Sequence, residues 1–120
     1  MNQRIEITNE AGVVLFSQAR IMNNLIQRVI GLMGRRTIDP HAAYLFPRCA
    51  SVHTCFMRVS IDLIFIDETR RVLAVETLRP WHVSRRVKGT AAIIEAACGS
   101  ARAKRIGQTE LLHLKGGRDV

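Results

Sequence analysis

Ser51-Val-His-Thr-Cys-Phe-Met-Arg58 is followed, after two residues, by Ile61-Asp-Leu-Ile-Phe-Ile-Asp67, and these two segments are the most informative of the chain. Both segments have the length of strands and are rich in β-branched and aromatic residues, so we predict that both are strands. Because side chains alternate across a strand, Asp62 shares its face with Ile64 and Ile66. A carboxylate on so apolar a face needs backbone donors or a basic partner, because an unpaired buried charge is costly.

Outward from this stretch, short apolar segments alternate with turn residues. Segments 9–12 and 67–70 suit hairpin turns. Segment 91–97 is ambiguous, because its alanines favour helix whereas Ile93 and Ile94 favour strand. A short helical turn is expected over residues 100–105. We predict about seven short strands, at residues 4–8, 13–16, 44–46, 52–58, 61–66, 72–77 and 111–114.

One sizeable helix is expected near the start of the chain, ending at Gly34. Its apolar stripe has helical spacing and consists of Ile21, Leu25, Val29, Leu32 and Met33. We therefore predict an α+β, mostly β fold, with a small barrel-like or sandwich-like antiparallel or mixed sheet and this N-terminal helix. The 120 residues suit a single domain, of which residues 115–120 would be a frayed tail.

Composition predicts a compact domain in a reducing compartment. Apolar residues make up 48% of the chain, which suits a packed core. Three cysteines, an odd number, do not suggest a disulfide framework. Residues 1–6 lack the features of a secretory signal, and no apolar run approaches the ~20 residues that cross a bilayer. We predict a cytoplasmic protein without a membrane span.

The net charge of +8 is placed unevenly along the chain. Segment 1–69 contains seven Arg and six acidic residues, whereas segment 70–120 contains eleven Lys or Arg and four acidic residues. A candidate basic patch consists of Arg85, Arg86, Lys88, Arg102, Lys104 and Arg105. The patch could contact phosphates, or it could be an ordinary solvated face, because no known DNA- or RNA-reading motif accompanies it. Charge alone supports only weak, salt-sensitive nucleic-acid binding.

Three segments carry a resemblance to a known family. They are 28–35 (Arg-Val-Ile-Gly-Leu-Met-Gly-Arg), 51–67 as quoted above, and 78–81 (Leu-Arg-Pro-Trp), with Cys98-Gly-Ser-Ala101 and Gly107 downstream. Together they resemble the uncharacterised family called domain of unknown function 192, over residues 19–112. The resemblance implies a small bacterial-type domain with a β-rich, barrel-like fold and a helix near the start. It implies no activity.

The polar and aromatic residues of these segments define a candidate binding site. Its members are His53, Arg58, Asp62, Arg79 and Trp81. Asp62 could act as a general base or anchor a ligand, or it could fix a strand junction, with Arg35, Arg58 or Arg79 as basic partners. Trp81, between basic neighbours, could be a stacking platform, or its indole could cover one end of a barrel.

Two combinations of cysteine and histidine suggest chemistry. His53 and Cys55 lie two residues apart, and a nucleophilic pair would need the imidazole within ~3 Å of the sulfur; otherwise Cys55 is a small core residue. A Cys₃His set for zinc is formed on paper by Cys49, His53, Cys55 and Cys98, but without the Cys-x₂-Cys spacing. Phosphate-loop, Rossmann and GxSxG motifs are absent from the sequence. We therefore assign no cofactor, metal or catalytic residue.

These features favour a non-enzymatic binding or accessory domain with a shallow polar and aromatic pocket for an unknown ligand or protein. One alternative is a basic nucleic-acid-binding or transcription-associated protein. Another is a small hydrolase or thiol enzyme built on His53, Cys55 and Asp62.

Overall fold

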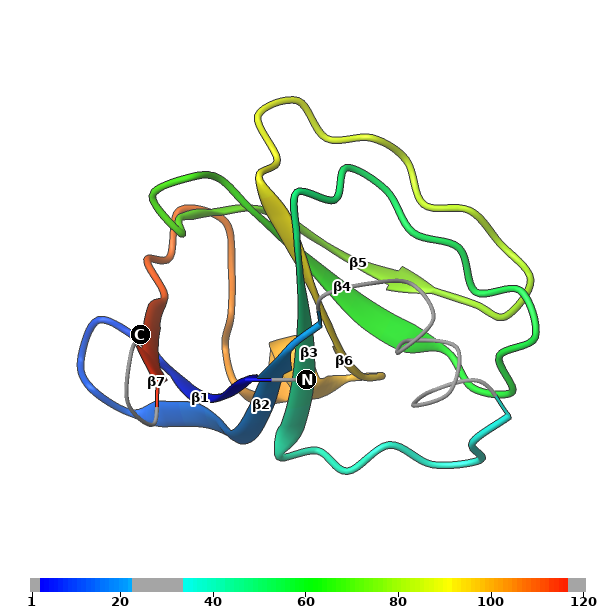
Figure 1. Ribbon diagram of the computed structural model, residues 1–120, viewed down its shortest axis with the longest axis horizontal. Helices are drawn as coiled ribbons and strands as arrows, with labels where there is room; N and C mark the ends of the chain where they lie inside the picture. Colours follow the sequence, from blue (N-terminus) through cyan, green and yellow to red (C-terminus); the bar gives the residue numbers. More distant parts are fainter. Residues whose placement is uncertain (1–2, 23–33, 117–120) are drawn as a thin grey trace.

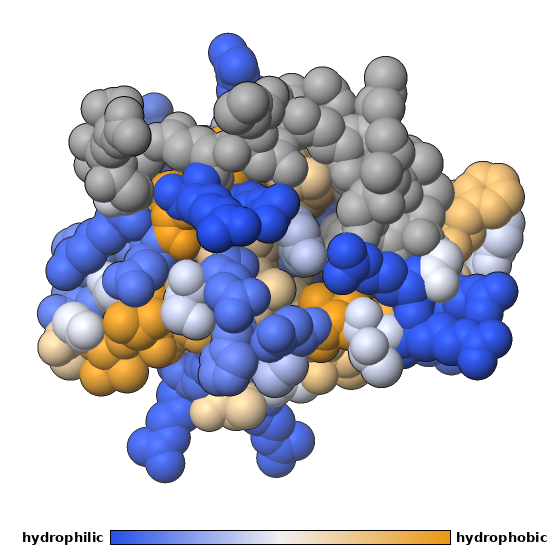
Figure 2. Space-filling model, turned by 60° about the horizontal axis from the view of Figure 1, so that its bottom comes forward, coloured by the Kyte–Doolittle hydropathy of each residue, from blue (hydrophilic) through white to orange (hydrophobic). Residues whose placement is uncertain are grey.

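The computed structural model describes residues 3–22 and 34–116, and in these residues the fold is a single seven-stranded sheet (Figure 1). The strands are β1 (Gln3–Thr8), β2 (Val14–Ile21), β3 (Ala42–Pro47), β4 (Ile61–Ile66), β5 (Val72–Leu78), β6 (Ala92–Ala97) and β7 (His113–Gly116). Helix α2 (Ser100–Ala103) follows β6. Strongly hydrophilic side chains stand in several groups on the face drawn in Figure 2.

The strands follow the order β5-β4-β6-β3-β2-β1-β7 across the sheet. Strands β2 and β3 run parallel, and every other neighbouring pair is antiparallel. Strand β4 has all six residues buried, because both faces of the sheet are covered there. A strand buried on both faces reads as a continuous apolar run rather than an alternating one.

The expectation of a barrel-like or sandwich-like sheet is wrong, because the sheet is not closed. Strands β5 and β7 are its two edges, and closure would require a continuous ladder between them. Arg71 and Leu111, just before these strands, form only an isolated bridge. Thr109, next to this bridge, has a φ of 72°. Such a backbone turn interrupts the extended conformation that a longer ladder would need.

The expected sizeable N-terminal helix is not present among the described residues. The only helix in the described ranges is α2, which has four residues. Ile21, the first residue of the predicted apolar stripe, ends strand β2 instead. The other four residues of the stripe fall within 23–33 and lie outside the described residues. In the part of the chain that is described, no helix is long and apolar enough to span a membrane.

Local predictions were confirmed in most segments and failed in one. Each of the six other predicted strands overlaps an observed strand, and the ambiguous segment 91–97 forms strand β6. The predicted strand 52–58 is wrong, because that segment forms a loop with a turn at Cys55 and Phe56. The short helical turn expected after Gly99 is present as α2. Strand β7 includes Lys115 and Gly116, and residues 117–120 lie outside the described part.

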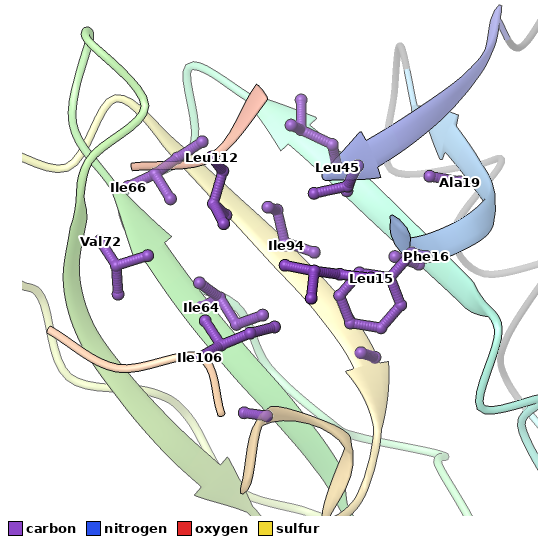
Figure 3. Close-up of a cluster of buried hydrophobic side chains, with 14 of the residues drawn as sticks. Leu15, Phe16, Ala19, Leu45, Ile64, Ile66, Val72, Ile94, Ile106 and Leu112 are labelled. Carbon is purple, nitrogen blue, oxygen red and sulfur yellow. The ribbon is translucent and has the colours of Figure 1, made fainter. Parts of the chain in front are cut away.

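Two hydrophobic cores cover the two faces of the sheet. The first core lies between β4, β6 and the β1–β2 hairpin, and Ile64, Ile94 and Phe16 are fully buried in it (Figure 3). The second core lies on the opposite face and contains Val52, Met57, Ile61, Leu63, Phe65 and Ile93. Val52 and Met57 come from the loop before β4, so this loop is packed onto the sheet by its own side chains.

Candidate functional site: the paired loops

Two loops lie side by side over the face of the sheet that carries the second core, and we call them the paired loops. They are residues 48–60, between β3 and β4, and residues 79–91, between β5 and β6 (Figure 1). The amide of Thr54 donates to the carbonyl of His82 at 2.8 Å, and the amide of Ser84 donates to the carbonyl of Val52 at 2.8 Å. These hydrogen bonds hold the two loops together as an irregular antiparallel ribbon, with a bridge between His53 and Val83.

Thr54 is the central residue of this ribbon, and its side chain is fully buried. Its Oγ1 donates to the carbonyl of Arg79 at 2.5 Å and accepts from the amide of His82 at 3.0 Å. Its carbonyl accepts from the amides of Met57 and Trp81, both at 3.0 Å. Thr54 therefore fixes the backbone on both sides of Trp81. Sequence reasoning missed it, although a hydroxyl inside the most characteristic segment was a signal.

Phe56 and Trp81 form an aromatic pair at the outer rim of the paired loops. Their ring centroids lie 4.7 Å apart, with an angle of 59° between the ring planes. Phe56 is nevertheless 64% exposed and Trp81 is 60% exposed. One interpretation of the sequence was that the indole covers one end of a barrel. The exposure of Trp81 does not support that interpretation. Sequence analysis did not single out Phe56, because its partner is 25 positions away along the chain.

Both aromatic residues have a left-handed backbone. The φ angle is 68° at Phe56 and 62° at Trp81. A bulky residue pays of order 1–3 kcal/mol in this region, so the conformation persists only where surrounding contacts impose it. Here the hydrogen bonds of Thr54 on either side impose it. The structure thus holds two aromatic residues with a strained backbone side by side and leaves their rings largely exposed to solvent.

The histidines of the paired loops bond to their own backbone. His53 Nδ1 accepts a hydrogen bond from the amide of Cys55 at 3.3 Å, and His82 Nδ1 lies 2.8 Å from the carbonyl of Pro80. Cys49 Sγ donates to the carbonyl of Ser51 at 3.1 Å. Nδ1 of His53 thus faces the backbone amide of Cys55, whereas a nucleophilic pair would direct the imidazole at the sulfur.

The predicted Cys₃His set is not assembled. Within residues 3–22 and 34–116, no three His, Cys, Asp or Glu side chains gather closely enough to hold a metal ion. Cys98 is exposed just after β6, whereas Cys49 and Cys55 are half-buried in the first of the paired loops. That loop also contains His53, but the four side chains do not converge on a metal position.

Asp62 lies on the opposite face of the sheet from the paired loops. It is 2% exposed. Its Oδ1 accepts from Thr77 Oγ1 at 2.8 Å, and its Oδ2 accepts from the amide of Ala101 at 2.9 Å. The expectation that Asp62 is held by specific donors is confirmed. These contacts connect β4 to β5 and to α2, so Asp62 joins three elements and does not meet Trp81.

Of the five predicted site residues, four come together in the paired loops and one does not. His53 and Arg58 lie in the first loop, and Arg79 and Trp81 lie in the second. Arg58 and Arg79 are exposed, which leaves their guanidinium groups available at the surface. Binding by these residues stays a prediction.

The predicted basic patch is divided between the two faces of the sheet. Arg85 pairs with Glu76, which stands opposite Leu63 of the second core, and Arg86 and Lys88 follow in the same loop. The Nζ of Lys104 instead lies 4.8 Å from the ring centroid of Phe16, a residue of the first core. Arg102 and Arg105, near Lys104 in the sequence, are exposed. On the face drawn in Figure 2, strongly hydrophilic side chains likewise stand in separate groups.

Glu95 is a buried acid that sequence analysis did not treat as a candidate. It is fully buried on β6, opposite Tyr44 of β3 and Leu63 of β4. The signal was a single acidic residue within the apolar segment 92–97. A buried carboxylate on a central strand is a residue type that functional sites often use.

Comparison with known sequences agrees with the resemblance drawn from segments 28–35, 51–67 and 78–81. The profile of the family DUF192, described as "Uncharacterized ACR", matches residues 6–113. This chain belongs to the DUF192 family.

Sequence relatives of this DUF192 protein carry the family-level name UPF0127. A UPF0127 protein of Pyrococcus abyssi is 35% identical over 100 residues, which cover 78% of this chain and 83% of that protein. One from Pyrococcus horikoshii is 40% identical over 72 residues, and this match spans only 60% of that protein's length. These relatives are archaeal, so they do not support the expectation of a bacterial-type domain.

Two crystal structures have the same fold as this DUF192 protein. A Sinorhizobium meliloti protein, provisionally assigned as a transcription regulator, has a TM-score of 0.75 and 19% identity, with coverage of 95% of this chain and 94% of that chain. A Novosphingobium aromaticivorans protein of unknown function has a TM-score of 0.73 and 19% identity, with coverage of 93% and 84%. At this identity the likeness shows the fold alone.

Proposed function

We propose that this DUF192 protein is a non-enzymatic binding or accessory domain that captures its partner on the paired loops. Phe56 and Trp81 would provide the contact surface, with His53, Arg58 and Arg79 at its border. The observation that carries the proposal is the exposure of two aromatic rings that contact each other in a tilted arrangement, both on a left-handed backbone.

Two physical arguments support a binding role for this pair. Exposed aromatic rings on a rigid backbone gain much of their burial only when a partner covers them, which is why aromatic residues dominate binding hot spots. A conformation that costs free energy in the isolated protein also calls for a compensating role. The Thr54 hydrogen bonds reduce the ordering cost of binding, because the rings are already held in place.

The alternatives have less support. A thiol enzyme would use Cys55 with His53, but Nδ1 of that imidazole accepts from the amide of Cys55. A hydrolase that uses Asp62 would need this carboxylate at a surface, whereas Asp62 is 2% exposed and its two oxygens already bond Thr77 and Ala101. A nucleic-acid-binding role is compatible with the paired loops, because neither loop contains an acidic residue. The odd number of cysteines continues to favour a reducing, cytoplasmic compartment.

Fluorescence of Trp81 provides a direct test, because Trp81 is the one tryptophan of the chain. Its emission would be followed during titration with three probes: a single-stranded oligothymidylate, an oligoglutamate peptide and phosphatidylglycerol vesicles. We expect at least one saturable change with wild-type protein. We expect Phe56→Asn to weaken this binding by about tenfold or more, as removal of a stacking partner does.

Asparagine is chosen because it tolerates the left-handed backbone better than alanine does. Phe56→Asn should therefore unfold at or above the wild-type temperature, which separates loss of binding from loss of folding. Val13→Ala is the matched control, because Val13 is 57% exposed at the distant β1–β2 turn. Saturable binding to none of the probes, or unchanged binding by a folded Phe56→Asn protein, would refute the proposal.

A further inference from the structure

The paired loops carry charge of one sign only. Neither loop contains an aspartate or a glutamate. Their charged residues are Arg48, Arg58, Arg79, Arg85, Arg86 and Lys88, and both loops also contain a histidine, His53 and His82. Glu76, at the side of the loops, pairs with Arg85. None of the six cations thus has an acidic residue within the loops themselves, and Glu76 of β5 offsets only Arg85 among the ion pairs of the described residues.

The cations share this surface with the aromatic pair. Arg58 follows Phe56 by two positions, and Arg79 precedes Trp81 by two positions. Both arginines are exposed. Hydrophobic and strongly hydrophilic side chains stand next to each other at the right edge of Figure 2, on the side where the paired loops project in Figure 1. The surface thus combines flat rings with positive charge.

We infer that the partner of this surface is a single-stranded nucleic acid. Its unstacked bases would lie on Phe56 and Trp81, and its phosphates would lie on Arg58, Arg79 and the other cations of the loops. Positively charged surfaces with exposed aromatic rings bind single strands in this way, because every base has a face that stacks. The inference rests on the function proposed above and names the partner class for the same surface.

Other polyanions fit the surface less well. An acidic peptide would satisfy the cations but would leave the two rings with no planar partner. Double-stranded DNA would satisfy the charge, but its bases are stacked within the duplex and cannot reach the rings. Both are therefore competitors in the test, with weaker binding expected for each.

Fluorescence anisotropy with labelled probes tests the inference. Oligothymidylate and oligouridylate of about 12 nucleotides would be compared, so that DNA and RNA are distinguished. We expect saturable binding to one or both that weakens about 20- to 50-fold between 50 and 200 mM salt, which corresponds to three or four neutralised phosphates. A duplex of the same length and an oligoglutamate peptide should bind at least about tenfold more weakly.

Variants assign the binding to this surface. Trp81→Asn should weaken binding about tenfold or more, whereas Trp81→Phe should restore most of it because a stacking ring remains. Arg79→Gln should weaken binding and reduce the slope of log affinity against log salt by about 0.7. Arg102→Gln removes one charge from the opposite face of the sheet and should bind within about twofold of wild type.

Each outcome separates this inference from the proposed function. Equal binding of duplex and single strand, or wild-type affinity in a folded Trp81→Asn protein, would overturn the nucleic-acid assignment. Phe56-dependent binding of oligoglutamate or of vesicles without binding of either oligonucleotide would refute this inference and keep the proposed function. Absence of binding to all probes would refute both.

Discussion

At the scale of single residues, Asp62 shows what a buried carboxylate does in this fold. We expect Asp62→Ala to lower the free energy of unfolding by about 2–4 kcal/mol, because the buried Ala101 amide would lose its charged acceptor and the link to the Thr77 hydroxyl would also be lost. Asp62→Asn keeps one acceptor oxygen and should cost about half as much. Urea denaturation measures both variants. Wild-type stability in Asp62→Ala with loss of oligonucleotide binding would instead return Asp62 to the binding site.

Asp67 makes the stability of the β4–β5 turn dependent on pH. Its Oδ1 accepts from Thr69 Oγ1 at 2.7 Å, from the amide of Thr69 at 2.9 Å and from the amide of Arg71 at 3.0 Å. The Thr69 hydroxyl first, and then the Arg71 amide, lower the pKa of Asp67 below its ordinary value of 3.8. A lowered folded-state pKa means that the carboxylate stabilises the protein above pH 3.8, and that this contribution is lost as pH falls through the folded-state pKa.

Asp67→Asn should therefore be less stable than wild type at neutral pH, and the difference should shrink as the pH falls below 3.8 and through the lowered folded-state pKa. Denaturation curves at a series of pH values give this comparison. Glu68→Gln, at an exposed neighbour in the same turn, should keep the wild-type pH profile. A constant difference between Asp67→Asn and wild type at every pH would contradict the assignment.

The sequence predicted that Asp62 needs hydrogen-bond donors, but it did not predict which residues supply them. The alternation of β4 places this carboxylate among Ile64 and Ile66, so its need was readable from local sequence. Its donors come from Thr77 and Ala101, which are 15 and 39 positions away. The three arginines considered as partners were chosen by charge, whereas the fold supplied a hydroxyl and a backbone amide.

At the scale of elements, the paired loops depend on one hydroxyl. Thr54→Val keeps the shape of the side chain but removes the hydroxyl. The amide of His82 and the carbonyl of Arg79 then lose a hydrogen-bond partner at a partly buried position. We expect a loss of about 1–3 kcal/mol in unfolding free energy. We also expect faster motion of the Trp81 indole, seen as lower steady-state fluorescence anisotropy.

Thr37→Val is the control for Thr54, since Thr37 is exposed and lies outside the paired loops. It should leave both stability and Trp81 anisotropy unchanged. If Thr54→Val weakened the fold without altering Trp81, the hydroxyl would hold the loops to the core rather than hold the rings in place.

Elements were predictable where local pattern and tertiary environment agree. Strand β1 alternates in sequence because one of its faces is exposed, and it was predicted from that alternation. Strand β6 gave an ambiguous signal, because burial on both faces removes alternation. Segment 52–58 has strand-like composition but bends at Phe56, because its hydrogen bonds go to segment 79–84 in the other loop. That pairing spans a distance in sequence that no local pattern reports.

At the scale of the whole molecule, topology was the least predictable property. Sequence patterns indicated about seven short strands; six of them overlap strands in the described residues, one was wrong, and the ambiguous segment 91–97 supplied β6. The order of the strands and the parallel pairing of β2 with β3 depend on long-range contacts. The assumption that many short strands close into a barrel failed because β5 and β7 share no ladder, and segments 70–72 and 109–112 make only the Arg71–Leu111 bridge with a few neighbouring hydrogen bonds.

The open sheet predicts a gradient of local stability from its centre to one edge. Strand β6 pairs with both β3 and β4, and Ile93 and Ile94 are fully buried. Strand β7 pairs with β1 alone and has no fully buried residue. In native-state hydrogen exchange we expect the amides of β6 to exchange only through global unfolding, whereas those of β7 exchange through local opening at a lower free energy.

Strand β1 is the internal control, because it shares the ladder of β7 but also pairs with β2, so the protection of its amides should fall between that of β6 and that of β7. Equal protection in β6 and β7 would mean that the edge is locked by the bridge at Leu111, and that the molecule behaves as a closed structure despite its open ladder.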